Sequence, residues 1–324
     1  MASTIRDVAR LADVSVATVS RVLNQVATVD QVLAQRVNSA MVELGYVPNS
    51  VGRALRLQQS NSWAVIAQSP NEFFNDVVVA VAREAEHSRT SVYLSLTGHD
   101  VERQNRYLQN ALSHRVSGLI VSSPAAFEPF RSFPLPAVFV DDGSDLVEHD
   151  VVSVDHAAIG TLAAQHLADR GYQRVACITA DLPGHPMRVR SQAFEEEASA
   201  RGLAIVREVV CDSAVSLADG QAAMLSVLSI PEPPDAVYCT NGPLTHGAYL
   251  GMLAAGVHTA LLGTDDEDWT SLATPSITVI GQPVDQIGKV AARLLQARIK
   301  GSADPAKHIA LDPLLIERHS TSRR

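Results

Sequence analysis

Polar residues follow several apolar runs between residues 136 and 282, at positions where they could bind a ligand. The runs PAVFVD, DAVYCTN, ALLGTD and ITVIGQ end in Asp141, Asn241, Asp265 and Gln282, and Arg190 stands in RVRSQAF at the start of a predicted helix. A carboxylate accepts several hydrogen bonds, and a guanidinium donates them in a fixed fork. Any one of these residues is equally well explained as a polar cap of a strand end. Together, around one cleft, they suit a ligand with several hydroxyl groups.

Alternating strands and helices would position these residues. WAVIA, SVYLSL, VSGLIV and PAVFVD lie within residues 63–141, RVACIT, VREVVC, DAVYCT and ALLGTD between 174 and 265, and ITVIGQP at 277–283. Amphipathic segments such as FNDVVVAVAREAEHS separate them, which predicts parallel sheets, and ligands bind beyond the carboxyl ends of such strands. Two series of roughly 100 residues each predict two similar lobes. Phe73, Phe74 and Trp269 could stack against a sugar face.

The N-terminal segment predicts three short helices. Residues 14–22, VSVATVSRV, are rich in β-branched residues and could also be written as an alternating strand. Thr4 and Asp7 have the spacing of a capping box, Ser15 can cap a second helix, and a third extends from Asp30 to Gly45. The apolar stripes at helical spacing are Val8, Leu11, Ala12; Val19, Val22, Leu23; and Leu33, Val37, Ala40, Met41, Leu44. Caps and stripes agree, so we predict a helix-turn-helix unit.

The second helix of such a unit lies in the DNA major groove. Val16, Ala17 and Thr18 are small enough to meet thymine methyl groups, and Arg21 can reach guanine or phosphate. Residues 1–60 hold six arginines and four acidic residues, whereas the whole chain has a net charge of −9. A basic end on an acidic chain favours DNA contact at that end, although a three-helix protein-contact module is the alternative.

TIRDVARLADVSVATVSRVLN, followed by LGYVPNSVGRAL, resembles the DNA-binding headpiece of the lactose/galactose repressor (LacI/GalR) family without gaps over residues 4–57. The resemblance implies base-reading positions at Val16, Ala17 and Arg21. The full set of expected DNA contacts is Thr4, Ser15, Val16, Ala17, Thr18, Ser20, Arg21, Asn24, Asn49 and Leu55. Asp13 stands where the family's turn usually has glycine, and aspartate tolerates the left-handed conformation better than most residues.

The segment VGRALRL predicts a hinge of one or two helical turns, which is marginal by itself. Gly52 weakens it further, by roughly 1 kcal/mol relative to alanine. In the resembling family this hinge folds when two subunits sit on the operator, and a leucine from each wedges into the minor groove. Leu55 matches that leucine, which would kink the duplex at a flexible base step.

Residues 63–318 also resemble this family, whose body has the fold of periplasmic sugar-binding proteins, with two lobes that close on a small effector. The resemblance and the aromatic positions together give the expected effector contacts Phe74, Asp141, Arg190, Asn241, Asp265, Trp269 and Gln282. Gly242 stands where the family usually has aspartate, so the cleft has one carboxylate fewer and no particular effector is implied. No apolar heptad tail follows LLIERHSTSRR, which favours a homodimer over a tail-assembled tetramer.

Other classes of protein fit less well. The charged start MASTIRDVAR lacks a signal peptide, and no apolar run approaches the ~20 residues of a membrane span, so we expect a cytoplasmic protein without membrane contact. Cys177, Cys211 and Cys239 have no disulfide or zinc spacing. Nucleotide-binding, hydrolase and metalloprotease motifs are absent, and the acidic run GTDDED is expected to be solvated, so we predict no catalytic residue, metal or cofactor.

These observations together predict an α/β chain with a helix-turn-helix headpiece (1–47), a hinge and linker (48–62) and a two-lobed body (63–324). The predicted function is a transcriptional regulator, a repressor of catabolic or transport genes. It would bind palindromic operator DNA under the control of a small effector, a sugar or sugar derivative. The alternative is a sugar- or nucleoside-binding protein of the same fold without a gene-regulatory role.

Overall fold

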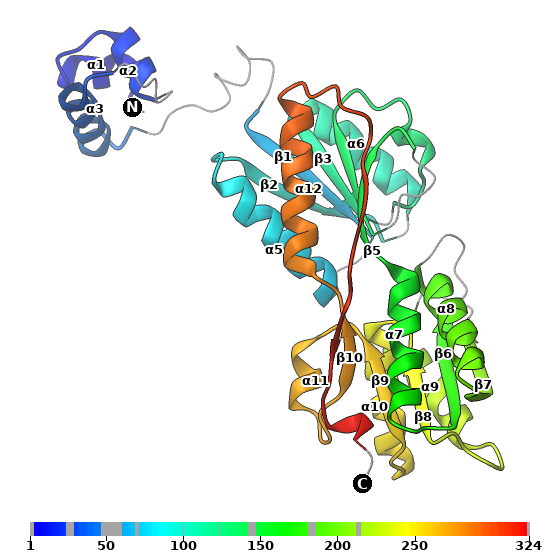
Figure 1. The fold of residues 1–324 in the computed structure, drawn as a ribbon. Coiled ribbons are helices and arrows are strands. Elements are labelled where there is room, and N and C mark those ends of the chain that lie inside the picture. Colours follow the sequence, from blue (N-terminus) through cyan, green and yellow to red (C-terminus); the bar gives the residue numbers. More distant parts are fainter. Residues whose placement is uncertain are drawn as a thin grey trace. The chain divides into compact units, whose positions relative to one another are not determined.

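The computed structural model describes residues 3–23, 29–46, 60–68, 71–98, 100–122, 124–141, 147–180, 186–211 and 215–322. The chain divides into two compact units, residues 1–60 and residues 61–324 (Figure 1). Among the described helices, none combines the length and apolarity needed to cross a bilayer.

The first unit is built from α1 (Ile5–Leu11), α2 (Val16–Leu23) and α3 (Gln31–Glu43). The predicted caps are present: Thr4 and Asp7 form a capping box, and the Ser15 hydroxyl accepts the Thr18 amide hydrogen at 3.0 Å. The three helices share one core, made of Val8, Ala9, Ala12, Val19, Val37 and Ala40. Leu11, which the spacing placed in this core, is 44 % exposed, and Ala9 is buried instead because the shared core lies on the side of α1 that carries Val8, Ala9 and Ala12.

The turn between α1 and α2 keeps its shape with aspartate in place of glycine. Asp13 adopts a left-handed conformation with φ of +50°. Arg36 of α3 donates to both the carbonyl and the carboxylate of Asp13, each at 3.2 Å. These hydrogen bonds offset part of the cost of the left-handed backbone.

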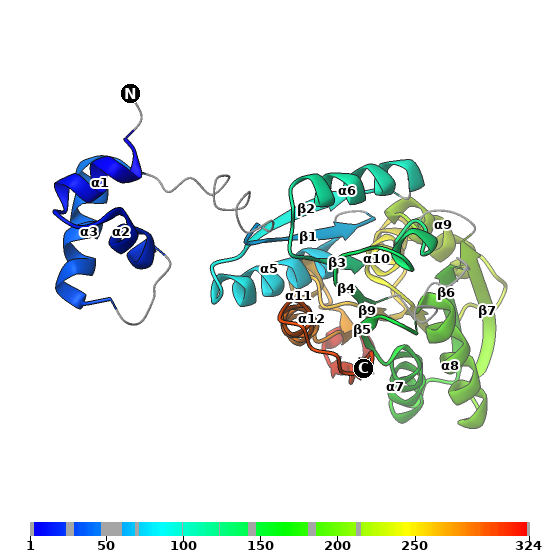
Figure 2. The same ribbon diagram turned by 90° about the horizontal axis from the view of Figure 1, so that it is seen from above.

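The second unit contains two six-stranded sheets, each the centre of one lobe. Lobe 1 has the order β11-β5-β4-β3-β1-β2, and all its pairs are parallel. Its strands are β1 (Ser62–Ala67), β2 (Ser91–Leu96), β3 (Gly118–Ser122), β4 (Ala137–Val140), β5 (Asp150–Val154) and β11 (His308–Leu311). Helices α5 (Glu72–Glu86) and α12 (Val284–Ile299) pack on one face and α6 (Val101–Ser113) on the other (Figure 2). Apolar side chains on both faces explain why β1 is a continuous buried run instead of an alternating one.

Lobe 2 has the order β12-β10-β9-β8-β6-β7, parallel except for the pair β10–β12. Its strands are β6 (Arg174–Ala180), β7 (Ala204–Cys211), β8 (Ala236–Cys239), β9 (Ala260–Thr264), β10 (Thr278–Gly281) and β12 (Leu314–Ile316). Helices α7 (His156–Asp169) and α8 (Pro186–Ala200) cover one face, and α9 (Leu217–Leu228) and α10 (Gly242–Ala255) the other. The short α11 (Asp268–Leu272) follows β9, and one-turn helices span Glu128–Phe130 and His319–Thr321.

The chain crosses between the lobes three times, after β5, after β10 and after β11. The sequence predicted two consecutive series of strands, which is correct for most strands. It missed β5, β11 and β12, and it did not show that α12 packs on lobe 1 after β10 has completed its place in lobe 2. The crossings bring residues 281–284 and 312–314 together at the junction of the lobes.

Candidate functional site

In the first unit, α2 presents the residues expected to read DNA. Val16, Ala17 and Arg21 are exposed, while Val19 of the same helix is completely buried in the core. Thr18 and Ser20 are half-buried at the edge of this face, and the hydroxyls of Ser15 and Thr18 lie 2.9 Å apart. The hydroxyl of Thr4 donates to the Asp7 carboxylate in the helix cap. Asn24, Asn49 and Leu55 lie outside the described residues, so their expected DNA contacts stay predictions.

In the second unit, a cavity of about 540 Å³ lies between the start of α5 in lobe 1 and the ends of β9 and β10 in lobe 2. Two of the expected effector residues, Asp265 and Gln282, line it. Its described lining has no lysine or arginine and six acidic residues, namely Glu72, Asp76, Asp265, Asp266, Glu267 and Asp312. A lining of this charge favours ligand groups that donate hydrogen bonds and disfavours anionic groups.

Asp265 is the centre of the polar contacts at this edge of the sheet. Its Oδ2 accepts the amide hydrogen of Gly242 at 3.0 Å, and its Oδ1 accepts a hydrogen from Gln282 Nε2 at 2.6 Å. The residue has φ of +73°, a left-handed conformation that turns the chain sharply at the end of β9. The Oε1 atom of Gln282 is buried and has no hydrogen-bond donor in the described part of the chain. It is an acceptor that a ligand in the cavity could use.

Asp141 and Arg190 belong to a second group of contacts, joined by His156. The Nη1 atom of Arg190 donates to the carbonyl oxygen of Thr240 at 2.9 Å, and Nη2 lies 3.2 Å from Nδ1 of His156. Because a guanidinium only donates, Nδ1 accepts and the imidazole hydrogen sits on Nε2. Nε2 lies 3.4 Å from both the carbonyl oxygen and the Oδ1 of Asp141. The group therefore connects lobe 1, at the end of β4, with α7 and α8 of lobe 2.

The other expected effector residues have structural contacts. The Oδ1 atom of Asn241 accepts the Leu244 amide hydrogen as the N-cap of α10. Phe74 is only 3 % exposed and packs in the core of lobe 1, whereas its neighbour Phe73 lines the cavity. Trp269 packs against α10 and is not part of the described cavity lining.

Glu267 is the site residue that the sequence did not reveal. We expected the acidic run GTDDED to be solvated, and Asp266 and Asp268 are indeed exposed, but Glu267 is half-buried. Its Oε2 accepts the indole hydrogen of Trp269 at 2.6 Å. The pKa of Glu267 is raised to about 7, mainly by burial and in smaller part by the neighbouring carboxylates of Asp265 and Glu72, while the indole hydrogen bond acts in the opposite direction. No pattern in the run itself distinguishes its fifth residue from the others.

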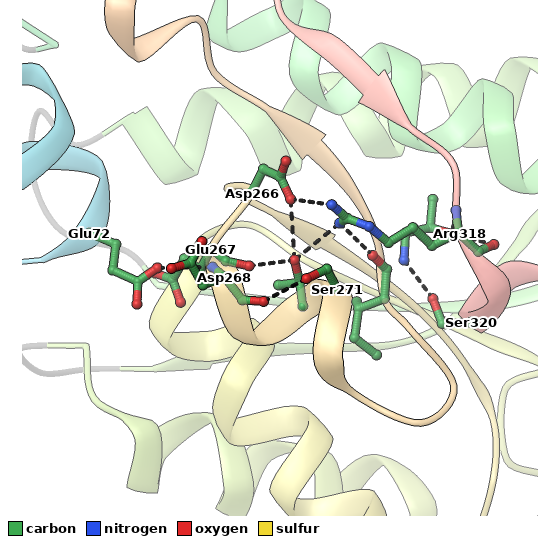
Figure 3. Close-up of polar contacts among 10 residues, drawn as sticks. Glu72, Asp266, Glu267, Asp268, Ser271, Arg318 and Ser320 are labelled. Carbon is green, nitrogen blue, oxygen red and sulfur yellow. Dashed lines mark hydrogen bonds and ion pairs between the residues drawn. The ribbon is translucent and has the colours of Figure 1, made fainter. Parts of the chain in front are cut away.

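Hydrogen bonds hold the loop that carries these acids on two sides (Figure 3). From lobe 1, the Glu72 carboxylate accepts the amide hydrogen of Asp268 at 3.3 Å. On the opposite side, Arg318 donates to Asp266 at 2.6 Å and to the hydroxyl of Thr270 at 3.0 Å. Among the described residues, no group of three or more histidine, cysteine, aspartate or glutamate side chains is arranged to hold a metal ion. The acidic loop forms one polar wall of the cavity, to which it contributes Asp265, Asp266 and Glu267.

Comparisons with known proteins show which families and proteins this chain resembles. Residues 4–49 match the family model described as bacterial regulatory proteins, lacI family, and residues 164–321 match that of the periplasmic binding protein-like domain. The chain is 32 % identical to the ribose operon repressor of Escherichia coli, over 98 % of this chain and 99 % of that protein. It is 29 % identical to the transcriptional repressor PurR of Aliivibrio fischeri, over 99 % of both.

Among solved structures, a lac repressor dimer bound to operator and the anti-inducer ONPF superimposes with a TM-score of 0.85, at 27 % identity over 99 % of each chain. These relatives match the chain over nearly its whole length, and the predicted α/β fold and regulator class are confirmed. The chain belongs to the lacI family of bacterial regulatory proteins, which are DNA-binding transcriptional regulators and not enzymes.

Proposed function

We propose that this protein represses transcription in the cytoplasm as a homodimer on a palindromic operator, and that an effector in the cavity between its lobes controls operator affinity. The exposed face of α2, with Val16, Ala17 and Arg21 above a packed core, is the observation that carries the DNA-binding part. Two headpieces related by a twofold axis would read the two halves of the operator, and phosphate contacts would make the affinity depend on salt. The dimeric, operator-bound lac repressor supports this arrangement.

Selection from a pool of random duplexes tests the DNA-binding part. We expect enrichment of one palindromic sequence, bound with an affinity that falls steeply as salt is raised. Operator selected in this way should lose affinity for the Arg21→Ala variant. Recovery of no common sequence would contradict the proposal, and a chain that binds sugar but enriches no duplex would be the alternative binding protein.

We propose that the effector is a small polyhydroxylated molecule, and the resemblance to a ribose operon repressor makes D-ribose the first probe. The acceptors Asp265 and Gln282, which line the cavity, support this class of ligand. An effector changes operator affinity only through its different affinities for two conformations of the body.

Thermal unfolding of the full chain tests the effector. A ligand that binds only the folded state raises its stability by RT ln(1 + [L]/Kd), so a panel of sugars, sugar phosphates and nucleosides should contain at least one stabiliser. Asp265→Asn should abolish the shift, while Asp219→Asn, on the remote helix α9, should not. Stabilisation that persists in Asp265→Asn would remove Asp265 from the site.

A further inference from the structure

The space above Gly242 is already occupied. A Cβ atom at this position would lie 2.4 Å from Oε1 of Glu267 and 3.4 Å from Oδ2 of Asp265. The first distance is much shorter than any van der Waals contact, so a side chain at 242 and the observed position of Glu267 exclude each other. The glycine therefore does not leave a gap, because a carboxylate from the loop after β9 lies where a side chain of α10 would begin.

The environment of Glu267 fixes one of its oxygens and leaves the other open. Oε2 accepts the Trp269 indole hydrogen, and the indole stacks on His246 of α10 with ring centroids 4.3 Å apart and planes at 17°. The ring of Tyr249, on the same helix, also packs against the indole, with ring centroids 5.6 Å apart. Oε1 has no hydrogen-bond donor within the described residues, although Glu267 lines the cavity beside Asp265. An oriented acceptor without a donor is what a binding site offers to a ligand.

We propose that Glu267 is a specificity-determining residue of the effector cavity. Oε1 of Glu267 and the carboxylate of Asp265 together accept hydrogen bonds from one ammonium group, or from two neighbouring hydroxyl groups, of the ligand. They exclude ligands that carry a phosphate or carboxylate at that point. This inference rests on the proposed effector site and narrows its ligand to neutral or aminated polyols. A buried like-charge contact costs more than a missing attraction, and the described lining has no lysine or arginine to compensate it.

The charged groups that face Glu267 make its contribution depend on pH. Asp265 and Glu72 are its acidic neighbours, and His246, whose pKa burial lowers, stacks on the face of the indole that donates to Glu267. As pH falls, Glu267 takes up a proton, accepts fewer hydrogen bonds and no longer repels an anionic ligand. The preference for an ammonium group should therefore weaken on acidification.

Matched pairs of probes test the inference: D-ribose against D-ribose 5-phosphate, and D-glucosamine against D-glucosamine 6-phosphate. Their dissociation constants are measured by calorimetry at about pH 8 and pH 6. In the wild-type protein we expect the unphosphorylated member of a pair to bind at least tenfold more tightly. Glu267→Gln keeps the shape and the acceptor for Trp269 but removes the charge, so it should lose most of this discrimination and its pH dependence.

Three further variants separate a recognition role from a structural one. Asp268→Asn removes one acid from the same loop without touching Gly242, so it should retain the discrimination. Glu267→Ala should bind the preferred probe weakly, and Gly242→Asp combined with Glu267→Ala should restore binding, because a carboxylate returns to the same volume. If the wild type and Glu267→Gln discriminate equally between the two members of a pair, or if the wild type prefers the phosphorylated member, the inference is wrong. The proposed polyol effector would not be affected by either result. Failure of all four probes to bind the wild-type protein would contradict the proposed polyol effector, and the inference with it.

Discussion

Glu267 should make the protein less stable as pH rises, and removing its charge should reverse that effect. Burial raises its pKa from 4.5 to about 7. Between these values the folded chain retains a proton that the unfolded chain has lost, so the stability contributed by this residue falls as pH rises through this window. At 1.36 kcal/mol per pKa unit, the full shift corresponds to about 3 kcal/mol. The carboxylate is only half-buried, and solvent screening reduces the expected effect to about 1–2 kcal/mol.

Glu267→Gln should therefore unfold at a higher urea concentration than the wild-type protein at about pH 8. The glutamine oxygen can still accept the Trp269 indole hydrogen, so the only large change is the loss of the charge. The two proteins should converge near pH 4.5, where both side chains are neutral. Asp268→Asn is the control, and its curve should follow the wild type at all pH values. A Glu267→Gln protein less stable than the wild type at pH 8 would show that the ionised carboxylate is stabilising and would refute this reasoning.

Three other substitutions test the headpiece and the body. Arg21→Ala should weaken operator binding by about 1–3 kcal/mol without changing the unfolding of the body, and an unchanged affinity in fluorescence anisotropy would exclude Arg21 from DNA contact. Gly160→Ala would place a Cβ atom 2.0 Å from the carbonyl oxygen of Arg190, so α7 and α8 must separate, and calorimetry should show a loss of about 1–3 kcal/mol. Asp150→Asn breaks a two-pronged ion pair with Arg298 at 2.7 and 2.8 Å and should cost about 3–5 kcal/mol in urea titrations. Burial acts to raise the pKa of Asp150, but the Arg298 hydrogen bonds, the Lys307 amide hydrogen bond and the charges of these two residues together lower it, so this stability should be lost as pH falls below 3.8.

The headpiece was predictable because its signals are local. A cap and its helix lie within a few residues of each other, so Thr4, Ser15 and Asp30 could be identified from spacing alone, and each caps the expected helix. Gly45 ends α3 with φ of +56°, as a glycine after a helix should. Leu11 was placed wrongly because the side of a helix that two other helices cover depends on packing between distant segments.

The body was predictable in class but not in connectivity. Continuous apolar runs identified most strands, yet β12 has three residues, too few to stand out from a loop. The place of α12 depends on its contact with α5, more than 200 residues earlier in the chain. Such pairings are invisible to periodicity, which reports which face of an element is apolar but not what covers it.

Some residues of the candidate site could be predicted from the sequence and others could not. Asp265 and Gln282 were found because polar residues at the ends of parallel strands gather at one edge of the sheet, and both line the cavity. Phe73, not Phe74, lines that cavity, a difference of one residue in the rotation of α5. Glu267 was missed because its role arises from contact with Gly242, which belongs to another element.

The acidic loop also shows how a ligand in the cavity could act on the lobes. Glu267 and Asp265 belong to lobe 2, and the carboxylate of Glu72, which raises the pKa of Glu267, reaches the same loop from lobe 1. Three carboxylates this close repel one another, so without a ligand they oppose the approach of the two lobes. An ammonium group, or two neighbouring hydroxyl groups, between them would donate hydrogen bonds and remove part of the repulsion. Arg318 holds the opposite side of the loop, so the loop cannot simply move away from the ligand. If the relief of repulsion favours closer lobes, it supplies the difference in affinity between two conformations that an effector needs in order to change DNA binding.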